Sequence, residues 1–371
     1  MGKVNPPLNV LYVNGGIMDM GGISSYMINY YRHINKNKIH IDFVVHGNEQ
    51  GTFDEEIKDS GSLIYNVPVK SKDYLGNINA LKRIFKTKKY PIVHSHLDAG
   101  SYHVLKVAKS CGIPVRIAHS HNTDFLATNL IKQIVNRYYR AQLRNVANYT
   151  MACSDMAGKW LFGENSTYQV IKNAIDIGKF VYSEKNRIQI RRKLNIDEDK
   201  IVIGHVGRFD KQKNHVFLLE LFAKLVRYKT DFRLVLIGDG NLHSLIENEI
   251  EKLHISDYVH LIGYTREIEK YYSAFDLFVM PSLFEGLGIA AIEAQTNGLH
   301  CILSDTLPAE AVVSSGAVRI PLQEQVWLQT ILKTQKVRQN NISSIIQAGY
   351  DIETEAQYLE DIYFNLVKRQ T

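Results

Sequence analysis

The sequence predicts an α/β protein built from two doubly wound parallel-sheet domains. Its 371 residues, 45% hydrophobic and 22% charged, are enough for two folded domains. Short apolar runs alternate with amphipathic stretches of helical period, which is typical of parallel sheets flanked by helices. This alternation stops and restarts once, near residue 200. We expect the two domains to face each other across a cleft, with strand ends and helix N-termini turned toward it, where ligands bind in such folds.

The first series of strands defines a domain that we expect over residues 1–180. Each strand is a short apolar run between polar or turn-forming residues, and a helix is expected in each gap. The predicted strands are Asn9–Val13, His40–Val45, Ser62–Asn66, Ile92–Ser95, Val115–Ala118 and Tyr149–Ala152.

The second series defines a domain that we expect over residues 181–350. The polar stretch 173–199, poor in strand signals, is interpreted as the connection between the domains. A last helix, Glu353–Lys368 within residues 351–371, has no strand to cross to, so we expect it to pack back on the first domain. The predicted strands of this series are Ile201–Val206, Leu234–Ile237, Val259–Ile262, Leu277–Met280 and Cys301–Leu303.

The cysteines and the hydropathy of the chain indicate the cellular compartment of the protein. Cys111, Cys153 and Cys301 are far apart and match no metal-binding spacing, which indicates a reducing compartment. No apolar run approaches the ~18 residues that a membrane-spanning helix needs, and the chain enters its first strand instead of a secretory signal. We therefore expect a cytoplasmic protein.

The charge is uneven, with +9 over residues 1–180 and −3 over residues 181–371. An ordinary solvated face, an anionic membrane surface and a nucleic acid are the possible reasons. No nucleic-acid motif is present, so we expect no nucleic-acid partner. Two segments favour a membrane at the inner leaflet. The first sets Lys82, Arg83, Lys86, Lys88 and Lys89 around Ile78, Leu81, Ile84 and Phe85, and the second, Phe125 to Tyr149, interleaves Lys132, Arg137, Arg140 and Arg144 with Leu130, Ile134, Tyr138 and Tyr139.

The sharpest motif is the segment 281–294, which follows the apolar strand Leu277–Met280 and leads from a glycine loop into a helix. Gly286 and Gly288 allow a ligand to approach the backbone, and free N–H groups at a helix start bind phosphate oxygens. Glu285 lies in the loop and Glu293 within the helix, too far apart for an acid/base pair. Two carboxylates on either side of an anion site suit a ligand with hydroxyls flanking a diphosphate, as in a sugar nucleotide.

A second motif, 207–214, follows the first strand of the second domain. Arg208 and Lys213 are two cations beside a helix N-terminus, and they would hold a diphosphate and stabilise the charge that grows on it as a sugar leaves. Lys211 is expected to be a bystander.

These motifs together resemble the retaining glycosyltransferases of family 4, which have the GT-B fold of two facing Rossmann-like domains. The resemblance covers nearly the whole chain and is closest to enzymes of bacterial capsule, exopolysaccharide or cell-wall glycan assembly. The matching segments are Gly21–Tyr26, His94–His96, His119–His121, Asn173–Asp176, Gly207–Asn214, Gly238–Gly240 and the E-x7-E pair Glu285 and Glu293.

The resemblance implies a role for each matching residue. Arg208, Lys213 and Glu285 are expected in the catalytic site together with His121, which borders the donor sugar. Asn173 and Asp176 match a family motif at the cleft, and they could equally cap a helix start. The donor-binding residues implied are Gly21, Gly22, Asp239, Gly240, Tyr264, Gly286, Leu287, Gly288 and Glu293.

Some alternatives stay open at this point. His119 rivals His121, because side chains two apart on an extended segment point the same way. Tyr264 could cover a base or fill a corner. We expect neither a cofactor nor an essential metal, because no carboxylate or cysteine joins the histidines and Asp197-Glu198-Asp199 precedes a strand instead of following one. The absence of G-x-G-x-x-G and Walker motifs disfavours dehydrogenases and P-loop enzymes.

The resemblance therefore implies a retaining transferase. It would move a hexose or N-acetylhexosamine from a nucleotide-diphosphate sugar, with UDP favoured, to a hydroxyl of a glycan acceptor that we expect to be lipid-linked, at the inner face of the membrane. The family suggests front-face attack without a protein general base. The alternative is a non-catalytic accessory subunit that binds glycan or a partner protein.

Overall fold

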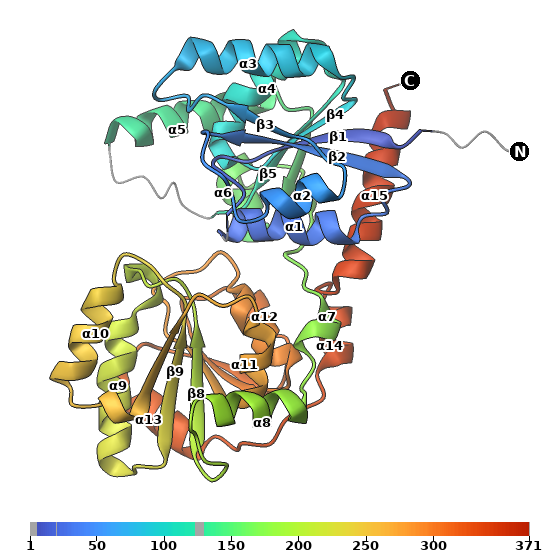
Figure 1. Ribbon diagram of the computed structural model, residues 1–371. Coiled ribbons are helices and arrows are strands. Elements are labelled where there is room, and N and C mark those ends of the chain that lie inside the picture. The colour runs from blue at the N-terminus through green and yellow to red at the C-terminus, as the bar shows by residue number, and fades with distance from the viewer. Residues whose placement is uncertain (1–5, 20, 123–129, 371) are drawn as a thin grey trace, which may run out of the picture. The chain divides into compact units, whose positions relative to one another are not determined.

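The computed structural model describes residues 6–19, 21–122 and 130–370, with side chains from Gln133 onward in the last range. The chain forms two compact units, one made of residues 1–174 and 352–371 and the other of residues 175–351. Each unit is a parallel sheet with helices on both faces (Figure 1).

Unit 1 contains a seven-stranded parallel sheet in the order β3-β2-β1-β4-β5-β6-β7. Five of its strands follow the predicted runs closely, and β3 is shifted by one or two residues. The two-residue β7 was not predicted, because two residues carry no periodic signal. The strands are β1 Leu8–Val13, β2 Ile39–His46, β3 Ile64–Val67, β4 Ile92–Ser95, β5 Val115–Ser120, β6 Tyr149–Ala152 and β7 Gln169–Val170.

Both faces of this sheet are covered, which explains its continuous apolar strands. Along β1, Val10 and Tyr12 face one layer of helices and Leu11 and Val13 face the other, and all four are fully buried. The first layer is α1 Gly22–His33, α2 Asp54–Asp59 and α15 Ile352–Lys368. The second is α3 Tyr74–Thr87, α4 Ser101–Ser110, α5 Leu130–Gln142 and α6 Asp155–Phe162.

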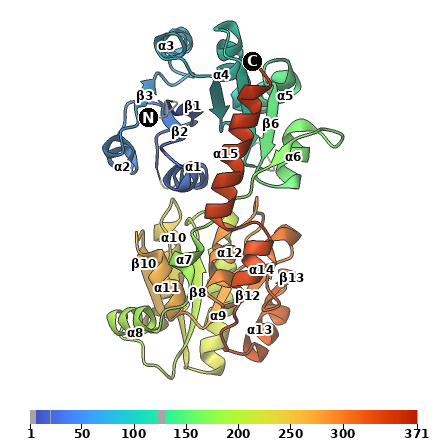
Figure 2. The same cartoon turned by 90° about the vertical axis from the view of Figure 1, so that its right-hand side faces the viewer.

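The last helix, α15, belongs to the core of unit 1. Its buried residues Ala356, Leu359 and Tyr363 share one hydrophobic cluster with α1 and the sheet. Figure 2 shows α15 running along this unit. The C-terminal segment therefore packs with strands that lie more than 200 residues earlier in the chain.

Unit 2 contains a six-stranded parallel sheet in the order β10-β9-β8-β11-β12-β13. Five strands were predicted, two of them, β8 and β11, with the observed bounds. The sixth, β13, escaped prediction because only Ala317 of its four residues is buried. The strands are β8 Ile201–Val206, β9 Phe232–Ile237, β10 Val259–Gly263, β11 Leu277–Met280, β12 His300–Ser304 and β13 Ala317–Ile320.

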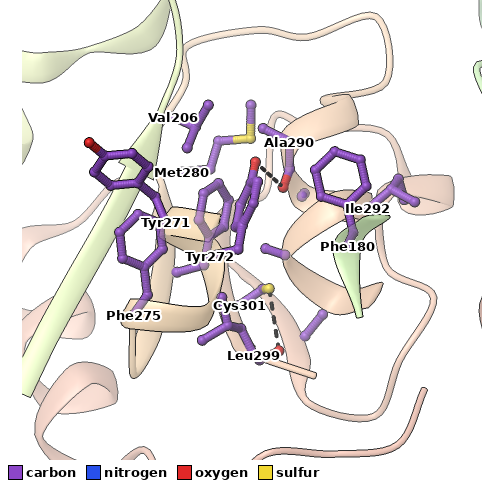
Figure 3. Packing of buried hydrophobic residues seen from close by; sticks show 14 of the residues in the cluster. Phe180, Val206, Tyr271, Tyr272, Phe275, Met280, Ala290, Ile292, Leu299 and Cys301 are labelled. Carbon is purple, nitrogen blue, oxygen red and sulfur yellow. Dashed lines mark hydrogen bonds between the residues drawn. The ribbon is translucent and has the colours of Figure 1, made fainter. Parts of the chain in front are cut away.

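Two hydrophobic clusters cover the two faces of the second sheet. The cluster in Figure 3 packs Tyr271, Tyr272 and Phe275 against Met280 and Ala290. This face carries α7 Ile177–Phe180, α8 Glu184–Lys193, α11 Ile268–Ala274, α12 Ile289–Thr296 and α14 Ile342–Gln347. The other face carries α9 His215–Tyr228, α10 His243–Lys252 and α13 Glu324–Lys333.

The two sheets share one topology. In each, the chain builds three strands outward in one direction and then returns to add the fourth beside the first, so the direction reverses between β1 and β4 and between β8 and β11. Ligands of doubly wound folds bind at this reversal, beyond the carboxyl ends of the strands. The loops after β1, β4, β8 and β11 are therefore where a site is expected.

The helix α3 corrects one expectation about a membrane surface. Leu81, Ile84 and Phe85 are buried in the core against the sheet, and Ile78 packs beside them. This apolar stripe is therefore unavailable to lipid. Of the second segment, Phe125 lies outside the described residues, as do the side chains of Leu130 and Lys132. Among the described helices, none is both long and apolar enough to cross a membrane.

Candidate functional site

The centre of the site in unit 2 is an ion pair between the loops that follow β8 and β11. Lys213 Nζ lies 2.5 Å from Glu285 Oε1, and the two side chains are only 15% and 7% exposed. Lys213 ends a single 3-10 turn, Lys211–Lys213, whose start is capped by Asp210 through its Oδ1. The pair therefore joins the two strands at which the topology of this sheet reverses.

Gln212 completes the surroundings of Glu285. Its Nε2 donates to Glu285 Oε2 at 3.2 Å and to the carbonyl oxygen of Phe284 at 3.0 Å. The amide N–H of Leu283 donates in turn to the Gln212 carbonyl at 2.8 Å. Both oxygens of Glu285 are thus engaged. Gln212 lies within the motif 207–214 but was not predicted as a site residue, although its place beside Lys213 was the available signal.

Glycines let these loops approach one another. A Cβ on Gly207 would lie 2.9 Å from Cδ of Lys213, so the lysine stem crosses the bare backbone there. A Cβ on Gly238 would lie 2.0 Å from the carbonyl oxygen of Gly207, and the φ of Gly238 is +146°. Only glycine fits this position without moving the backbone.

The loop after β11 ends in backbone amides with spare donor capacity. Gly288 has φ +81° and ψ 60°, a left-handed conformation that turns the chain into α12. Within the described chain, the N–H groups of Gly286, Leu287 and Gly288 donate to no backbone acceptor. Free amides at the start of a helix attract anions, and Lys213 adds a positive charge from the neighbouring loop.

Arg208 stands apart from this pair. Its side chain is 72% exposed, and its Nε donates to Asp210 Oδ2 at 2.7 Å. The structure thus brings Lys213 and Glu285 together and leaves Arg208 on the same loop, paired with Asp210.

The predicted donor-binding residues Asp239, Gly240 and Tyr264 follow β9 and β10. Asp239 is exposed, and its Oδ1 accepts from the Gly240 amide at 2.8 Å and lies 2.9 Å from His243 Nδ1. The His243 hydrogen bond, followed by that of the Gly240 amide, lowers the pKa of Asp239. The Gly238 amide donates to the carbonyl oxygen of Gly263 at 3.0 Å, next to Tyr264, which is 49% exposed. These residues form an open rim beside the loop of Arg208.

Glu293 lies inside α12 and has a different partner from Glu285. Its Oε2 accepts from the Tyr272 hydroxyl at 2.6 Å, and that hydroxyl also approaches the Ala290 carbonyl, as Figure 3 shows. Burial of the carboxyl group raises the pKa of Glu293 to about 7, although the Tyr272 bond opposes the shift. The two glutamates of the motif therefore sit in different environments, as their spacing predicted.

Unit 1 gathers four histidines at the ends of β4 and β5. His94 Nε2 lies 3.0 Å from His119 Nδ1, and His96 Nδ1 lies 2.9 Å from His121 Nε2. The rings of His119 and His121 stack with centroids 4.2 Å apart, and those of His94 and His96 lie 4.1 Å apart with their planes tilted by 30°. Desolvation lowers the pKa of all four, that of His121 to about 3, so the imidazoles are neutral.

The structure distinguishes the two rival histidines. Both rings point the same way, but His119 is completely buried, whereas His121 is 9% exposed. Tyr26 from α1 lies against both, with ring centroids 5.2 Å from His119 and 4.9 Å from His121. His121 is therefore the member of the cluster that reaches solvent.

Asp98 is a residue that sequence reasoning missed. Its Oδ1 accepts from the amide of His121 at 2.6 Å, and its Oδ2 accepts from Asn122 Nδ2 at 2.7 Å. Burial raises its pKa to about 6. Asp98 has φ +47°, an unusual conformation for a residue other than glycine. No local pattern in the sequence announces such a conformation.

The remaining predicted residues of unit 1 lie near α1. Gly21 precedes this helix and donates its N–H to Asp19 Oδ1 at 3.0 Å, and a Cβ on Gly22 would meet nothing within 4 Å. Asn173 follows β7, and its Oδ1 is buried without a hydrogen-bond partner in the described part of the chain. Its neighbour Asp176 caps α7 through the amide of Lys179.

Three of the histidines have the spacing of a metal site. His94, His96 and His119 each place one nitrogen within 4.8 Å of the others. Both ring nitrogens of His94 are already engaged, with Tyr363 and with His119, so a metal ion bound by His94 would have to replace one of these hydrogen bonds. The expectation that no metal is needed stays a prediction.

The fold of both units, with its sites at the ends of β8 and β11 and of β4 and β5, defines the GT-B class of glycosyltransferases. The Anabaena protein Alr3699/HepE, solved in complex with UDP-glucose, superimposes with a TM-score of 0.79 at 17% identity, over 96% of this chain and all of that one. This likeness shows the fold, and it confirms the predicted fold class.

The chain belongs to the glycosyltransferases. Residues 20–179 match the model of Glycosyltransferase Family 4, and residues 186–325 match that of Glycosyl transferases group 1. "Putative glycosyltransferase EpsF" of Bacillus subtilis (strain 168) is 33% identical over 95% of this chain and 96% of its own length. The UDP-Gal:alpha-D-GlcNAc-diphosphoundecaprenol alpha-1,3-galactosyltransferase of Escherichia coli is 25% identical over 78% and 79%. The resemblance read from the motifs is thereby confirmed.

Proposed function

We propose that the protein is a retaining glycosyltransferase that moves a hexose or an N-acetylhexosamine from a UDP-sugar to a hydroxyl of a lipid-linked glycan. The reaction would belong to bacterial surface polysaccharide assembly at the inner face of the membrane. The observation that carries the proposal is the Lys213–Glu285 pair beside the free amides of Gly286 to Gly288. A cation and backbone N–H groups at one point are what a departing diphosphate needs.

In this proposal the leaving group is stabilised by the protein alone. Lys213 would turn from Glu285 to the diphosphate when the donor binds, and Arg208, free of buried contacts, would swing onto it from the same loop. Glu285 would then accept hydrogen bonds from the sugar hydroxyls. These groups stabilise the growing negative charge without a metal ion, and the departing phosphate oxygen would take the proton of the acceptor hydroxyl.

The choice of donor and acceptor rests on the relatives. The Anabaena neighbour binds UDP-glucose, and the E. coli relative acts on a diphosphoundecaprenol acceptor with UDP-galactose. An N-acetylgalactosaminyltransferase of Campylobacter jejuni, 32% identical over 37% of this chain, also has a diphospho-undecaprenol acceptor. A lipid-linked acceptor also fits the basic character of residues 1–180.

A membrane surface on unit 1 would bring the enzyme to such an acceptor. With the α3 stripe buried, the exposed apolar side chains of this unit include Leu75 at the start of α3 and Ile134 and Tyr138 on α5, which are 71%, 67% and 54% exposed. Arg137 lies among them. Sedimentation with anionic vesicles at low salt tests this surface, and an I134E/Y138E variant that still sediments would contradict it.

The test of the function is a donor panel offered with a membrane lipid extract. Mass spectrometry should find UDP released from one UDP-sugar, together with a lipid-linked product one sugar heavier. A chain that binds nucleotide sugars yet releases no nucleotide with any acceptor would support the non-catalytic accessory subunit instead.

A further inference from the structure

The histidine cluster of unit 1 contains an ordered chain of protons. The Tyr363 hydroxyl donates to the Tyr12 hydroxyl at 3.1 Å, and His94 Nδ1 lies 2.6 Å from the same Tyr363 oxygen. Because the single hydroxyl proton of Tyr363 is donated to Tyr12, the Tyr363 oxygen can only accept from His94, which therefore donates through Nδ1. Its Nε2 is then an acceptor in the bond with His119, so His119 donates through Nδ1.

With this order of donors, His119 Nε2 carries no proton and has a free lone pair. That nitrogen is buried and has no partner among the described residues, and His96 Nε2 is in the same position. A buried N–H without an acceptor is rarer in proteins than a buried acceptor without a donor. We therefore expect His96 Nε2 to be unprotonated as well, which places the proton of His96 on Nδ1.

His96 then donates to His121 through Nδ1, over 2.9 Å. His121 Nε2 accepts, so the proton of the neutral His121 ring lies on Nδ1. This nitrogen has no partner in the described part of the chain, and His121, at 9% exposure, is the least buried ring of the cluster. The free nitrogen of the cluster is thus an N–H donor.

The backbone of His121 is held from both sides. Asp98 accepts from its amide at 2.6 Å, and Cys153 Sγ lies 3.6 Å from its carbonyl oxygen. Asp98 does so from a left-handed conformation that is unusual for a residue other than glycine and persists only where the surrounding structure holds it. Asp98 fixes the backbone position from which the His121 ring projects. His96 determines which nitrogen of that ring carries the proton.

We propose that His96 and Asp98 are positioning residues that make His121 a hydrogen-bond donor, through Nδ1, to an oxygen of the substrate. The inference rests on the proposed function and deepens it, since it makes His121 a ligand for a hydroxyl or phosphate oxygen and not a general base. A neutral, desolvated imidazole that already offers a proton cannot accept one at the same nitrogen.

The first test is independent of activity. In the 15N-labelled full-length protein without ligand, long-range 1H–15N correlation spectra should show His121 protonated at Nδ1 and not at Nε2. His121→Gln identifies the signal by its loss. Protonation of His121 at Nε2 would overturn the proposal. A chain with the expected tautomer that transfers no sugar would contradict the proposed function and leave this assignment intact.

The second test uses variants of His96. His96→Phe keeps an aromatic ring against Tyr12 but removes the donor, so both His121 tautomers should appear and kcat should fall about tenfold with little change in donor KM. His96→Asn places an amide N–H where Nδ1 lies, and should restore the single tautomer and most of the rate. His103→Phe is the matched control, because it removes a buried bond to Asn77, 2.8 Å long, outside the cluster. Equal losses in both Phe variants would indicate a structural role only.

Discussion

The candidate sites of the two units lie at strand ends of sheets with the same topology, but their side chains differ in charge and in exposure to solvent. In unit 2 the loops at the strand reversal carry charged groups with exchangeable partners, and Arg208 is 72% exposed. In unit 1 the ends of β4 and β5, beside the strand reversal, carry four neutral imidazoles that bond to one another in two pairs, and three of these rings are completely inaccessible to solvent. The first arrangement suits a ligand that brings its own charge. The second arrangement provides a rigid, uncharged surface that can orient a neutral group of a ligand.

The sharpest way to break this comparison is to remove the cation of unit 2. Lys213→Ala should lower kcat at least about 100-fold, because one fixed group that stabilises the departing charge is lost. Donor-dependent nucleotide release measures it. Lys211→Ala is the matched control, since Lys211 is an exposed lysine of the same turn, and it should stay within about twofold. Similar losses in the two variants would mean that only the general charge of the loop matters.

Substitutions of Gly238 and Gly207 test the shape of the unit 2 site without changing its charge. Gly238→Ala forces a Cβ onto the carbonyl oxygen of Gly207, 2.0 Å away, so the backbone must shift and unit 2 should lose about 2 kcal/mol or more of unfolding free energy. Gly207→Ala meets only the flexible stem of Lys213, so it should weaken donor binding with a smaller loss of stability. Denaturant unfolding and donor titration measure both. The comparison fails if Gly207→Ala destabilises the protein as much as Gly238→Ala.

The histidine cluster of unit 1 and the buried Glu293 of unit 2 should also respond to pH in opposite directions. The cluster imidazoles have a lowered pKa, so below about pH 6.5 the unfolded chain binds more protons than the folded one, and acid destabilises unit 1. Glu293 has a pKa raised to about 7, so the folded chain binds more protons between the usual value of 4.5 and 7, and stability is lost as the pH rises through that window. Asp98, whose pKa is raised to about 6, has the opposite effect on the pH dependence of unit 1, but it binds only one proton against the four of the histidines.

Hydrogen exchange of peptides over β4–β5 and over α11–α12 between pH 5 and 7.5, corrected for intrinsic rates, should therefore show protection rising with pH in the first and falling in the second. Glu293→Gln keeps the acceptor for Tyr272 and should abolish only the second trend. Parallel trends in the unmodified protein would show that these buried groups do not govern the local stability.

Much of the fold was predictable because buried parallel strands are apolar on both faces. β4, β6, β8 and β11 have the predicted bounds, since each is a short apolar run ended by polar residues. β7 and β13 were missed because they are short and little buried. The stripe on α3 was misinterpreted for a related reason: an amphipathic helix looks the same whether its apolar face meets a sheet or a lipid.

The sites were predictable only as far as residue type and order reveal chemistry. Lys213 and Glu285 were identified as candidates because a lysine and a carboxylate occur in glycine-bearing loops after strands. Gln212 and Asp98 were not, because their roles depend on contacts across the fold, with Glu285 and with the amide of His121. The buried pairing of the histidines likewise depends on β4 and β5 being neighbours, a register that sequence alone leaves open.

The smallest expected effect lies at the rim of unit 2, where Tyr264 is 49% exposed. If this ring stacks on the base of the donor, Tyr264→Ala should weaken nucleotide binding about tenfold and leave the melting temperature unchanged, because base–aromatic stacking contributes about 1–3 kcal/mol. Calorimetric titration with UDP measures it. Tyr228→Ala, at the end of α9 and 75% exposed, is the control and should leave UDP affinity unaltered. A drop in melting temperature with unchanged affinity would assign Tyr264 to packing, and the open rim would then recognise the nucleotide through Asp239 and its neighbouring backbone alone.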